Sequence, residues 1–266
     1  MLASSSQDLQ ITRLEPVFLM NATHHQPVYD ALDAADVIFA QRISDEFKLD
    51  WLASAQISKT FGDKVVVWPN IYFDGYFPGV NYVYHGTYGK LLSPLLEYHF
   101  TQVMVAHKAG HSIDAAISAF AGEGLLAASP DPFAQSIAQL QAREEDTDVV
   151  ISDFIAEQAS KQRLFYTPNH PVNILLGEML SRLTRKAGLE IDIARSVAIP
   201  YQLDEVYIAT SPAVVQKYNL SFDTEAHYRG REVVSVHESV VLLGDRKDYD
   251  VRQLVEAFYR LYDQVF

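Results

Sequence analysis

The stretch that decides the predicted fold is VVVWPNIYFDGY, residues 65–76, in which a short β-branched run ends abruptly in polar, proline and asparagine residues. The same pattern occurs in VIFAQRISD at residues 37–45 and in LFYTPNHPVN at residues 164–173. Open α/β sheets bind ligands at the carboxyl ends of their parallel strands. The three stretches therefore predict three strand ends that face one crevice.

Strand-like and helix-like segments alternate along the first half of the chain, which is typical of a parallel α/β sheet. The predicted fold is a three-layer α/β structure, in which a parallel sheet is flanked by helices and the C-terminal part is rich in helix. The 266 residues are expected to form one α/β domain, 1–266, with a core at about 8–173 and a helical or irregular annex at about 174–266. Strands are predicted at 9–18, 36–40 and 64–68, and helices at 26–35 and 47–61.

The rest of the chain mixes helical periodicity with irregular segments. Residues 74–89 are too aromatic for a linker and predict an ordered loop over the crevice. Residues 199–211 are predicted to be irregular, and residues 233–243 fit a strand or a buried helix. Further helices are predicted at 91–108, 112–120, 132–145, 149–160, 174–187 and 251–266.

Composition excludes several classes of function. The chain has 34 acidic and 21 basic residues and a formal net charge of −13, which opposes nucleic-acid binding. No apolar stretch approaches the roughly 20 residues of a membrane-spanning helix. The first residues lack the features of a secretory signal, which favours a cytoplasmic protein. The absence of cysteine excludes disulfides, thiolate metal sites and a cysteine nucleophile within these residues.

His170 is the first candidate for an acid or base. It lies in a proline-bracketed turn after a predicted strand, between Asn169 and Asn173. An imidazole in this position can titrate near neutral pH and be oriented by the neighbouring amides. The alternative is a turn histidine that caps the helix predicted from residue 174.

The segment after the 64–68 strand carries an amide, Asn70, a carboxylate, Asp74, and two phenols, Tyr72 and Tyr76. So many hydrogen-bonding groups at one strand end favour a binding function. The alternative is an aromatic plug in which the Asx side chains satisfy loop backbone groups.

Gln41 and Arg42 follow the 36–40 strand, and a guanidinium there suits a phosphate group. Ser44 is expected only to cap the next helix. No metal site is predicted, because His99 and its neighbouring histidines lack an HExxH-type pattern. P-loop, dinucleotide-binding and G-x-S-x-G motifs do not occur in the sequence.

Three motifs carry a resemblance to a known family. DVIFAQRISD at residues 36–45, WPNIYFDGY at residues 68–76 and Glu97-Tyr98-His99 together resemble the WcbI family of bacterial polysaccharide-biosynthesis proteins. The resemblance covers roughly the first 120 residues and extends through residues 164–173. It implies a coenzyme A-binding acetyltransferase that uses acetyl-CoA as its co-substrate. The implied acceptor is a capsular or exopolysaccharide sugar, presented as a carbohydrate, a nucleotide sugar or a polysaccharide.

Family members open with a strand and a Gly-Asn-Cys-Gln turn, whose cysteine the resemblance implies as the nucleophile. This chain lacks that turn. The favoured interpretation is that an upstream piece is missing, and the alternative is an enzyme that works without a thiol. In the second case a histidine would deprotonate a sugar hydroxyl that attacks the acyl group directly.

These arguments select one set of candidate residues. The catalytic candidates are His170, His99 and Asp74. Aromatic residues, Tyr84 among them, would line a pantetheine slot, and Arg42 or Lys90 would bind the phosphates. The cofactor-binding candidates are Gln41, Arg42, Asn70, Tyr72, Tyr76, Lys90, Asn169 and Asn173.

Two other functions stay open at this point. One is an SGNH-like carbohydrate esterase or deacetylase with His170 as its base, and the other is a non-catalytic module that binds a sugar or coenzyme A. The sequence leaves the oligomeric state open.

Overall fold

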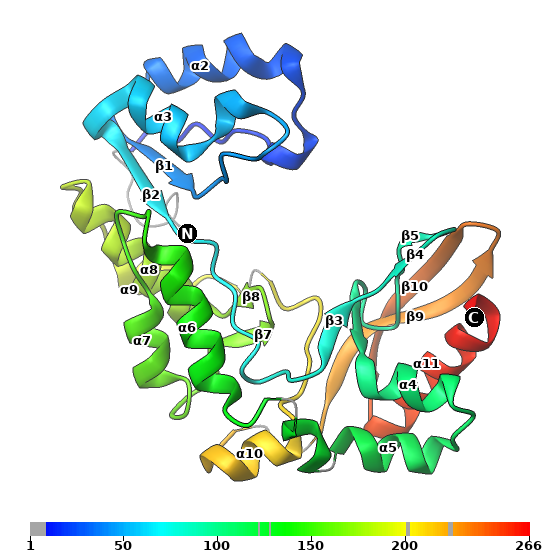
Figure 1. Cartoon of the computed structure of the whole chain (residues 1–266). Helices are drawn as coiled ribbons and strands as arrows, with labels where there is room; N and C mark the ends of the chain where they lie inside the picture. Colours follow the sequence, from blue (N-terminus) through cyan, green and yellow to red (C-terminus); the bar gives the residue numbers. More distant parts are fainter. Residues whose placement is uncertain (1–8, 122, 128, 201–202, 223–225) are drawn as a thin grey trace. The chain divides into compact units, whose positions relative to one another are not determined.

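The computed structural model describes residues 9–121, 123–127, 129–200, 203–222 and 226–266 (Figure 1). Contacts divide the chain into two compact units, each assembled from three separate segments. Unit 1 comprises Met1–Ile71, Ala138–Phe154 and Asn173–Pro200, and unit 2 comprises Tyr72–Ile137, Ile155–Val172 and Tyr201–Phe266. Residues before and after position 173 thus contribute to both units. The single domain 1–266, with a core at about 8–173 and an annex at about 174–266, stays a prediction.

Unit 1 contains the one parallel strand pair of the described residues. Strand β1 (Ile38–Gln41) pairs with β2 (Val65–Trp68) in the register that sets Ile38 opposite Val65. These are the strands predicted at 36–40 and 64–68. The other paired strands are antiparallel, so the prediction of a three-layer parallel sheet is wrong and the fold is a mixed α/β structure with small sheets.

Two local features explain why this sheet does not extend. The backbone N–H of Val67 donates to the Asp148 carboxylate at 2.7 Å, and the Asp148 N–H donates to the Val67 carbonyl at 2.9 Å, so a loop satisfies groups on β2. The strand predicted at 9–18 does not form. Its alternating apolar residues are not buried, since Ile11 is 42% and Phe18 68% exposed, and burial is what stabilises an alternating strand.

Two helices cover this strand pair, α2 (His25–Asp33) and α3 (Ser54–Phe61) (Figure 1). Helix α3 ends at Gly62, whose φ of 64° suits a glycine C-terminus. It is shorter than the helix predicted at 47–61, because Asp50–Leu52 forms a separate 3₁₀ turn. The buried residues of this core are Met20, Val28, Leu32, Ile38, Leu52, Ile57, Val65 and Val67.

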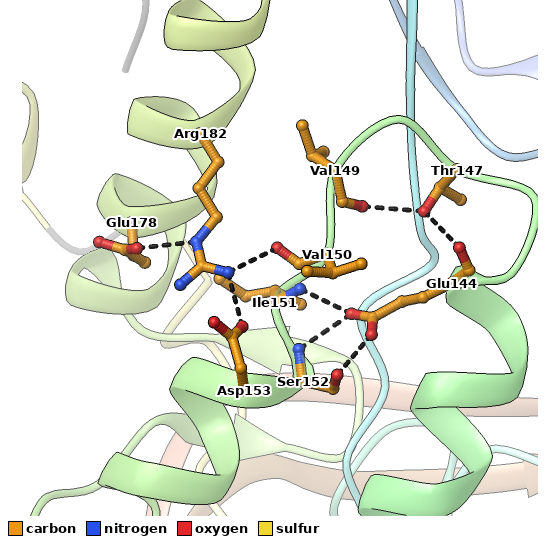
Figure 2. Close-up of polar contacts among 9 residues, drawn as sticks. All are labelled: Glu144, Thr147, Val149, Val150, Ile151, Ser152, Asp153, Glu178 and Arg182. Carbon is orange, nitrogen blue, oxygen red and sulfur yellow. Dashed lines mark hydrogen bonds and ion pairs between the residues drawn. The ribbon is translucent and has the colours of Figure 1, made fainter.

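The later segments of unit 1 are helical and are joined by a polar network (Figure 2). The buried Glu144 carboxylate accepts hydrogen bonds from the N–H groups of Ile151, at 2.6 Å, and Ser152, at 2.9 Å. Arg182 donates to Asp153 at 2.5 Å. Glu144 thereby satisfies orphan donors at the first turn of a helix, as a capping residue does. The network involves α6 (Pro132–Glu144), α7 (Ser152–Gln158) and α8 (Asn173–Lys186), of which α6 and α7 each include residues of both units. Helix α9 (Ile193–Val197) follows α8 in unit 1.

The described part of unit 2 contains four antiparallel strand pairs. Residues 74–89, predicted as a loop, contribute to three short strands of unit 2, which are β3, β4 and β5. Residues 233–243, predicted as a strand or a buried helix, belong to the long hairpin of β9 and β10. The pairs are β3 (Val80–Tyr82) with β6 (Tyr98–Phe100), β4 (Tyr84–His85) with β5 (Gly89–Lys90), β7 (Phe165–Thr167) with β8 (His170–Pro171), and β9 (Tyr228–His237) with β10 (Val240–Tyr249).

The helices of unit 2 include α4 (Thr101–Lys108), α5 (Ile113–Ala121), α10 (Pro212–Tyr218) and α11 (Val251–Val265). Helix α11 packs beside the β9–β10 hairpin and contacts α4 and α5 (Figure 1). It buries Leu254, Phe258 and Leu261 along one face, as its 3.6-residue periodicity predicts. Helix α4 begins ten residues later than predicted, because the preceding residues pair as β6. Among the described residues, no helix has the length and apolar character needed to cross a bilayer.

Candidate functional site

The β7–β8 hairpin of unit 2 presents His170 at the end of a tight turn. Thr167 pairs with His170 across the hairpin, and Pro168 and Asn169 form the turn between them. The turn is held by the 65–76 motif, because the Phe73 N–H donates to the Pro168 carbonyl at 2.8 Å. The Phe73 ring also stacks on Phe165, with centroids 5.4 Å apart and planes inclined by 23°.

A cluster of hydroxyl and amide groups surrounds this turn. The Tyr98 hydroxyl donates a hydrogen bond to Asn169 Oδ1. The Thr167 hydroxyl oxygen lies 3.0 Å from the Tyr98 hydroxyl oxygen and 3.2 Å from Asn169 Oδ1. Thr167 is buried, whereas Asn169 is half-buried. Burial raises the pKa of the Tyr98 hydroxyl, so Tyr98 stays a neutral hydrogen-bonding group.

His170 lies against this cluster, with its ring centroid 6.2 Å from that of Tyr98 in an edge-on arrangement. The side chain is half-buried, and its Nδ1 atom is buried without a hydrogen-bond partner among the described residues. Desolvation by burial lowers the pKa of His170, while Glu97 and Glu205 act in the opposite direction. The imidazole is therefore neutral near pH 7, which is the form that accepts a proton.

A lysine and a carboxylate lie next to the same tyrosines. Lys90 Nζ is 3.1 Å from Glu97 Oε1 and 4.6 Å from the centroid of the Tyr82 ring. Tyr82 pairs with Tyr98 across β3 and β6, and their ring centroids are 5.6 Å apart. Lys90 is thus a partly exposed cation near the His170 cluster.

His99 lies in a different environment. It is 1% exposed, its Nδ1 is 2.9 Å from the Tyr262 hydroxyl, and its Nε2 is 3.0 Å from the Leu91 carbonyl. Desolvation by burial lowers its pKa to about 4. Both ring nitrogens are therefore occupied within the core, which favours a structural role for His99 and leaves His170 as the better placed base.

Residues 72–76 differ in how far their side chains are buried. Tyr76 is fully buried, and its hydroxyl donates to the Ala159 carbonyl at 2.7 Å, so it acts as a core residue. Tyr72 is half-buried. The Asp74 N–H donates to Ser136 Oγ at 3.0 Å, while the half-buried Asp74 carboxylate makes no hydrogen bond to the described residues.

The remaining candidates belong to unit 1. Arg42 is paired with Asp146 at 2.7 Å. Asn173 is buried at the start of α8 and donates to the Ile199 carbonyl at 2.8 Å, which is a structural contact. Gln41 and Asn70 are exposed. Their participation in one site with His170 stays a prediction.

Comparison with known proteins identifies the family. The family model described as "Polysaccharide biosynthesis enzyme WcbI" matches residues 1–192 of this chain, which is more than half of its length. The chain belongs to the WcbI family.

The fold of this WcbI-family chain is similar to that of a solved WcbI structure, with a TM-score of 0.69 and 16% sequence identity. The similarity covers 97% of this chain and 80% of the other. The solved protein is described as a novel polysaccharide biosynthesis enzyme, in a native form without a disulfide bond between coenzyme A and one of its cysteines. Comparison with curated proteins gives no match.

His107 and His111, the histidines that follow His99 in the sequence of this WcbI-family member, do not form a metal centre with it in the described structure. His107 Nε2 is 2.8 Å from Asp263, an ion pair or hydrogen bond between α4 and α11. Within the described ranges, no three His, Cys, Asp or Glu side chains are arranged to hold a metal ion.

Sequence reasoning missed three members of the cluster, Tyr82, Tyr98 and Thr167. The signal for Tyr98 was present, because it stands in the Glu97-Tyr98-His99 motif of the WcbI-family resemblance. Its contact with Asn169 joins residues 71 positions apart. No local pattern encodes such a contact.

Proposed function

We propose that this polysaccharide-biosynthesis family member transfers an acyl group, acetyl in the simplest case, from coenzyme A to a hydroxyl of a carbohydrate acceptor. The observation that carries the proposal is the half-buried His170, held neutral by desolvation beside a hydrogen-bonded cluster of Tyr98, Thr167 and Asn169. A neutral imidazole at such a position is the group that general-base catalysis of acyl transfer requires.

His170 would take the proton from the acceptor hydroxyl as its oxygen attacks the thioester carbonyl carbon. A carbon–oxygen bond forms, and the carbon–sulfur bond then breaks. His170 returns the proton to the leaving sulfur, so the products are an O-acyl sugar and free coenzyme A. The imidazole ends the cycle neutral, as it began.

The residues present fit coenzyme A in two respects. The Lys90 ammonium, 36% exposed beside the cluster, can bind an anionic phosphate, and the half-buried Tyr72 can contact the pantetheine arm. When bound, acetyl-CoA supplies the activated acyl group. The solved WcbI structure is described with reference to a cysteine and coenzyme A, whereas residues 1–266 of this chain include no cysteine. These residues would therefore perform the transfer by direct attack, without a covalent acyl-cysteine.

The proposal is tested with acetyl-CoA and the variant His170→Gln. Binding is measured by calorimetry, and turnover is measured as release of free thiol in the presence of methyl hexopyranosides as acceptors. We expect His170→Gln to bind acetyl-CoA as the wild type does and to lose about 10²- to 10⁴-fold in kcat, the usual contribution of a general base. His111→Gln, an exposed histidine of the same unit, serves as the matched control.

Two results would contradict the proposal. One is a folded wild-type protein that does not bind acetyl-CoA, and the other is a His170→Gln variant with wild-type turnover. Hydrolysis of 4-nitrophenyl acetate without any acetyl-CoA turnover would assign the cluster to an esterase instead.

A further inference from the structure

Asn169 directly precedes His170 and lies in the turn between β7 and β8. Its amide oxygen is fully engaged. The Tyr98 hydroxyl donates to Oδ1, and the Thr167 hydroxyl oxygen is 3.2 Å from the same atom. A side-chain amide with its oxygen held by two hydroxyl groups has a fixed rotamer and a fixed direction for its nitrogen.

The other end of this amide is available. Asn169 is half-buried, and its Nδ2 makes no hydrogen bond to any residue in the described part of the chain. An amide nitrogen carries two donor hydrogens. The turn therefore offers a fixed, uncommitted pair of donors one residue from the proposed base.

We infer that Asn169 is a catalytic residue whose Nδ2 donates a hydrogen bond to the oxygen of the reacting carbonyl, with Tyr98 and Thr167 as its positioning residues. The inference rests on the proposed acyl transfer. As the acceptor oxygen bonds to the carbonyl carbon, the π electrons of the carbonyl move onto its oxygen. The Asn169 donor stabilises that oxyanion until the carbon–oxygen double bond forms again and the carbon–sulfur bond breaks. Preorganised donors of this kind contribute strongly because they need no reorientation during the reaction.

A purely structural role for Asn169 makes a different prediction. If the residue only holds the turn, its oxygen is the essential atom. Asn169→Asp keeps an oxygen acceptor for both hydroxyl groups, so this variant should then keep its activity. If the nitrogen is essential, Asn169→Asp fails as Asn169→Ala does, because both variants lack the donor. The pair of variants therefore separates the two roles.

The experiment measures thiol release from acetyl-CoA and its binding by calorimetry for both variants. We expect a loss of about 10²- to 10³-fold in kcat for each, the effect of removing one oxyanion donor, with acetyl-CoA affinity unchanged. Tyr98→Phe should lower kcat less than Asn169→Ala does, with little change in KM. The matched controls are Asn81→Ala, which removes an exposed amide bonded to Thr101, and Tyr259→Phe, which removes a hydroxyl bonded to the His111 carbonyl.

An infrared measurement gives a readout that needs binding alone. The carbonyl stretch of acetyl-CoA labelled with carbon-13 at the carbonyl should move to lower frequency when the wild-type protein binds it, because a hydrogen bond weakens the carbonyl bond. In Asn169→Ala this shift should be lost. Wild-type kcat in Asn169→Asp, or an unchanged infrared shift in Asn169→Ala, overturns the inference and leaves the proposed function standing. A wild-type protein that binds no acetyl-CoA, or binds it and releases no thiol, overturns both.

Discussion

His99 and His170 lie in the same unit, but their surroundings give them different chemistry. His99 has both nitrogens bonded inside the core, whereas His170 keeps a buried Nδ1 without a partner among the described residues. Desolvation lowers the pKa of both imidazoles. A neutral histidine with both nitrogens satisfied stabilises a core, whereas a half-buried neutral histidine with an unsatisfied nitrogen keeps the capacity to accept a proton.

The buried state of His99 makes the stability of the protein depend on pH. The unfolded chain binds a proton at this residue below about pH 6.5, whereas the folded protein does so only below a pKa of about 4. Between these values the unfolded state holds more protons, so the free energy of unfolding falls as the pH falls. We expect the titration of His99 to lower the free energy of unfolding of the wild type by roughly 2 kcal/mol between pH 7 and pH 5.

Urea unfolding at pH 7 and pH 5 measures this difference. His99→Gln keeps a polar side chain and removes the titration, so its stability should decline less between the two values. An equal decline in the wild type and in His99→Gln would show that another group causes the acid sensitivity.

At the scale of elements, the sequence predicts best where a helix carries its own signals. Helix α11 has an amphipathic pattern and a capping box between Asp250 and Gln253, and α8 is followed by Gly188 with a φ of 69°. Both helices form close to their predicted limits. Helix content was overestimated at residues 91–108, because the pairing of β6 with β3 outweighs the local propensity there.

The β9 strand illustrates a constraint that only the folded structure reveals. Gly230 is buried, and a Cβ atom at this position would lie 1.9 Å from the Pro94 carbonyl oxygen, which also accepts the Arg231 N–H at 2.8 Å. We expect Gly230→Ala to lower the free energy of unfolding by about 1 to 3 kcal/mol, the usual cost of overpacking.

Urea denaturation of Gly230→Ala and of the control Gly86→Ala tests this expectation. A Cβ at Gly86 would have no atom within 4 Å, so this variant should be close to the wild type. Equal stability of the two variants would mean that the backbone at Pro94 moves away without cost.

At the scale of the whole molecule, the chain passes between its two units several times, and this limits what a sequence pattern can place. The polar segments after β1, β2 and β7 are predicted ligand-binding strand ends; Asn169 lies in the turn after β7, and His170 begins β8. The hydroxyl partners of Asn169 are Tyr98 on β6 and Thr167 on β7. The alternation of strands and helices in the sequence favours one parallel sheet. It does not reveal that β7 pairs with β8 in unit 2, whereas β1 and β2 pair in unit 1.

The interleaved chain predicts the behaviour of a fragment comprising residues 1–200. This fragment contains every segment of unit 1 and all of the region matched by the WcbI family model, but it lacks 201–266 of unit 2. The missing residues include Tyr228, Phe258 and Tyr262, which are fully buried. Without them the hairpin that carries His170 has no complete core to pack on. We therefore expect the fragment to lose thiol release from acetyl-CoA while unit 1 keeps its fold.

Tryptophan fluorescence separates these two outcomes, because both tryptophans of the chain, Trp51 and Trp68, belong to unit 1. The emission maximum of the fragment should match that of the full chain, and the tyrosine signals in its near-ultraviolet circular dichroism should weaken. A fragment with full activity would show that residues 201–266 are dispensable for the site. A fragment with red-shifted tryptophan emission would show that unit 1 depends on unit 2 for its stability, since its apolar core alone would then be insufficient to offset the conformational entropy of its three segments.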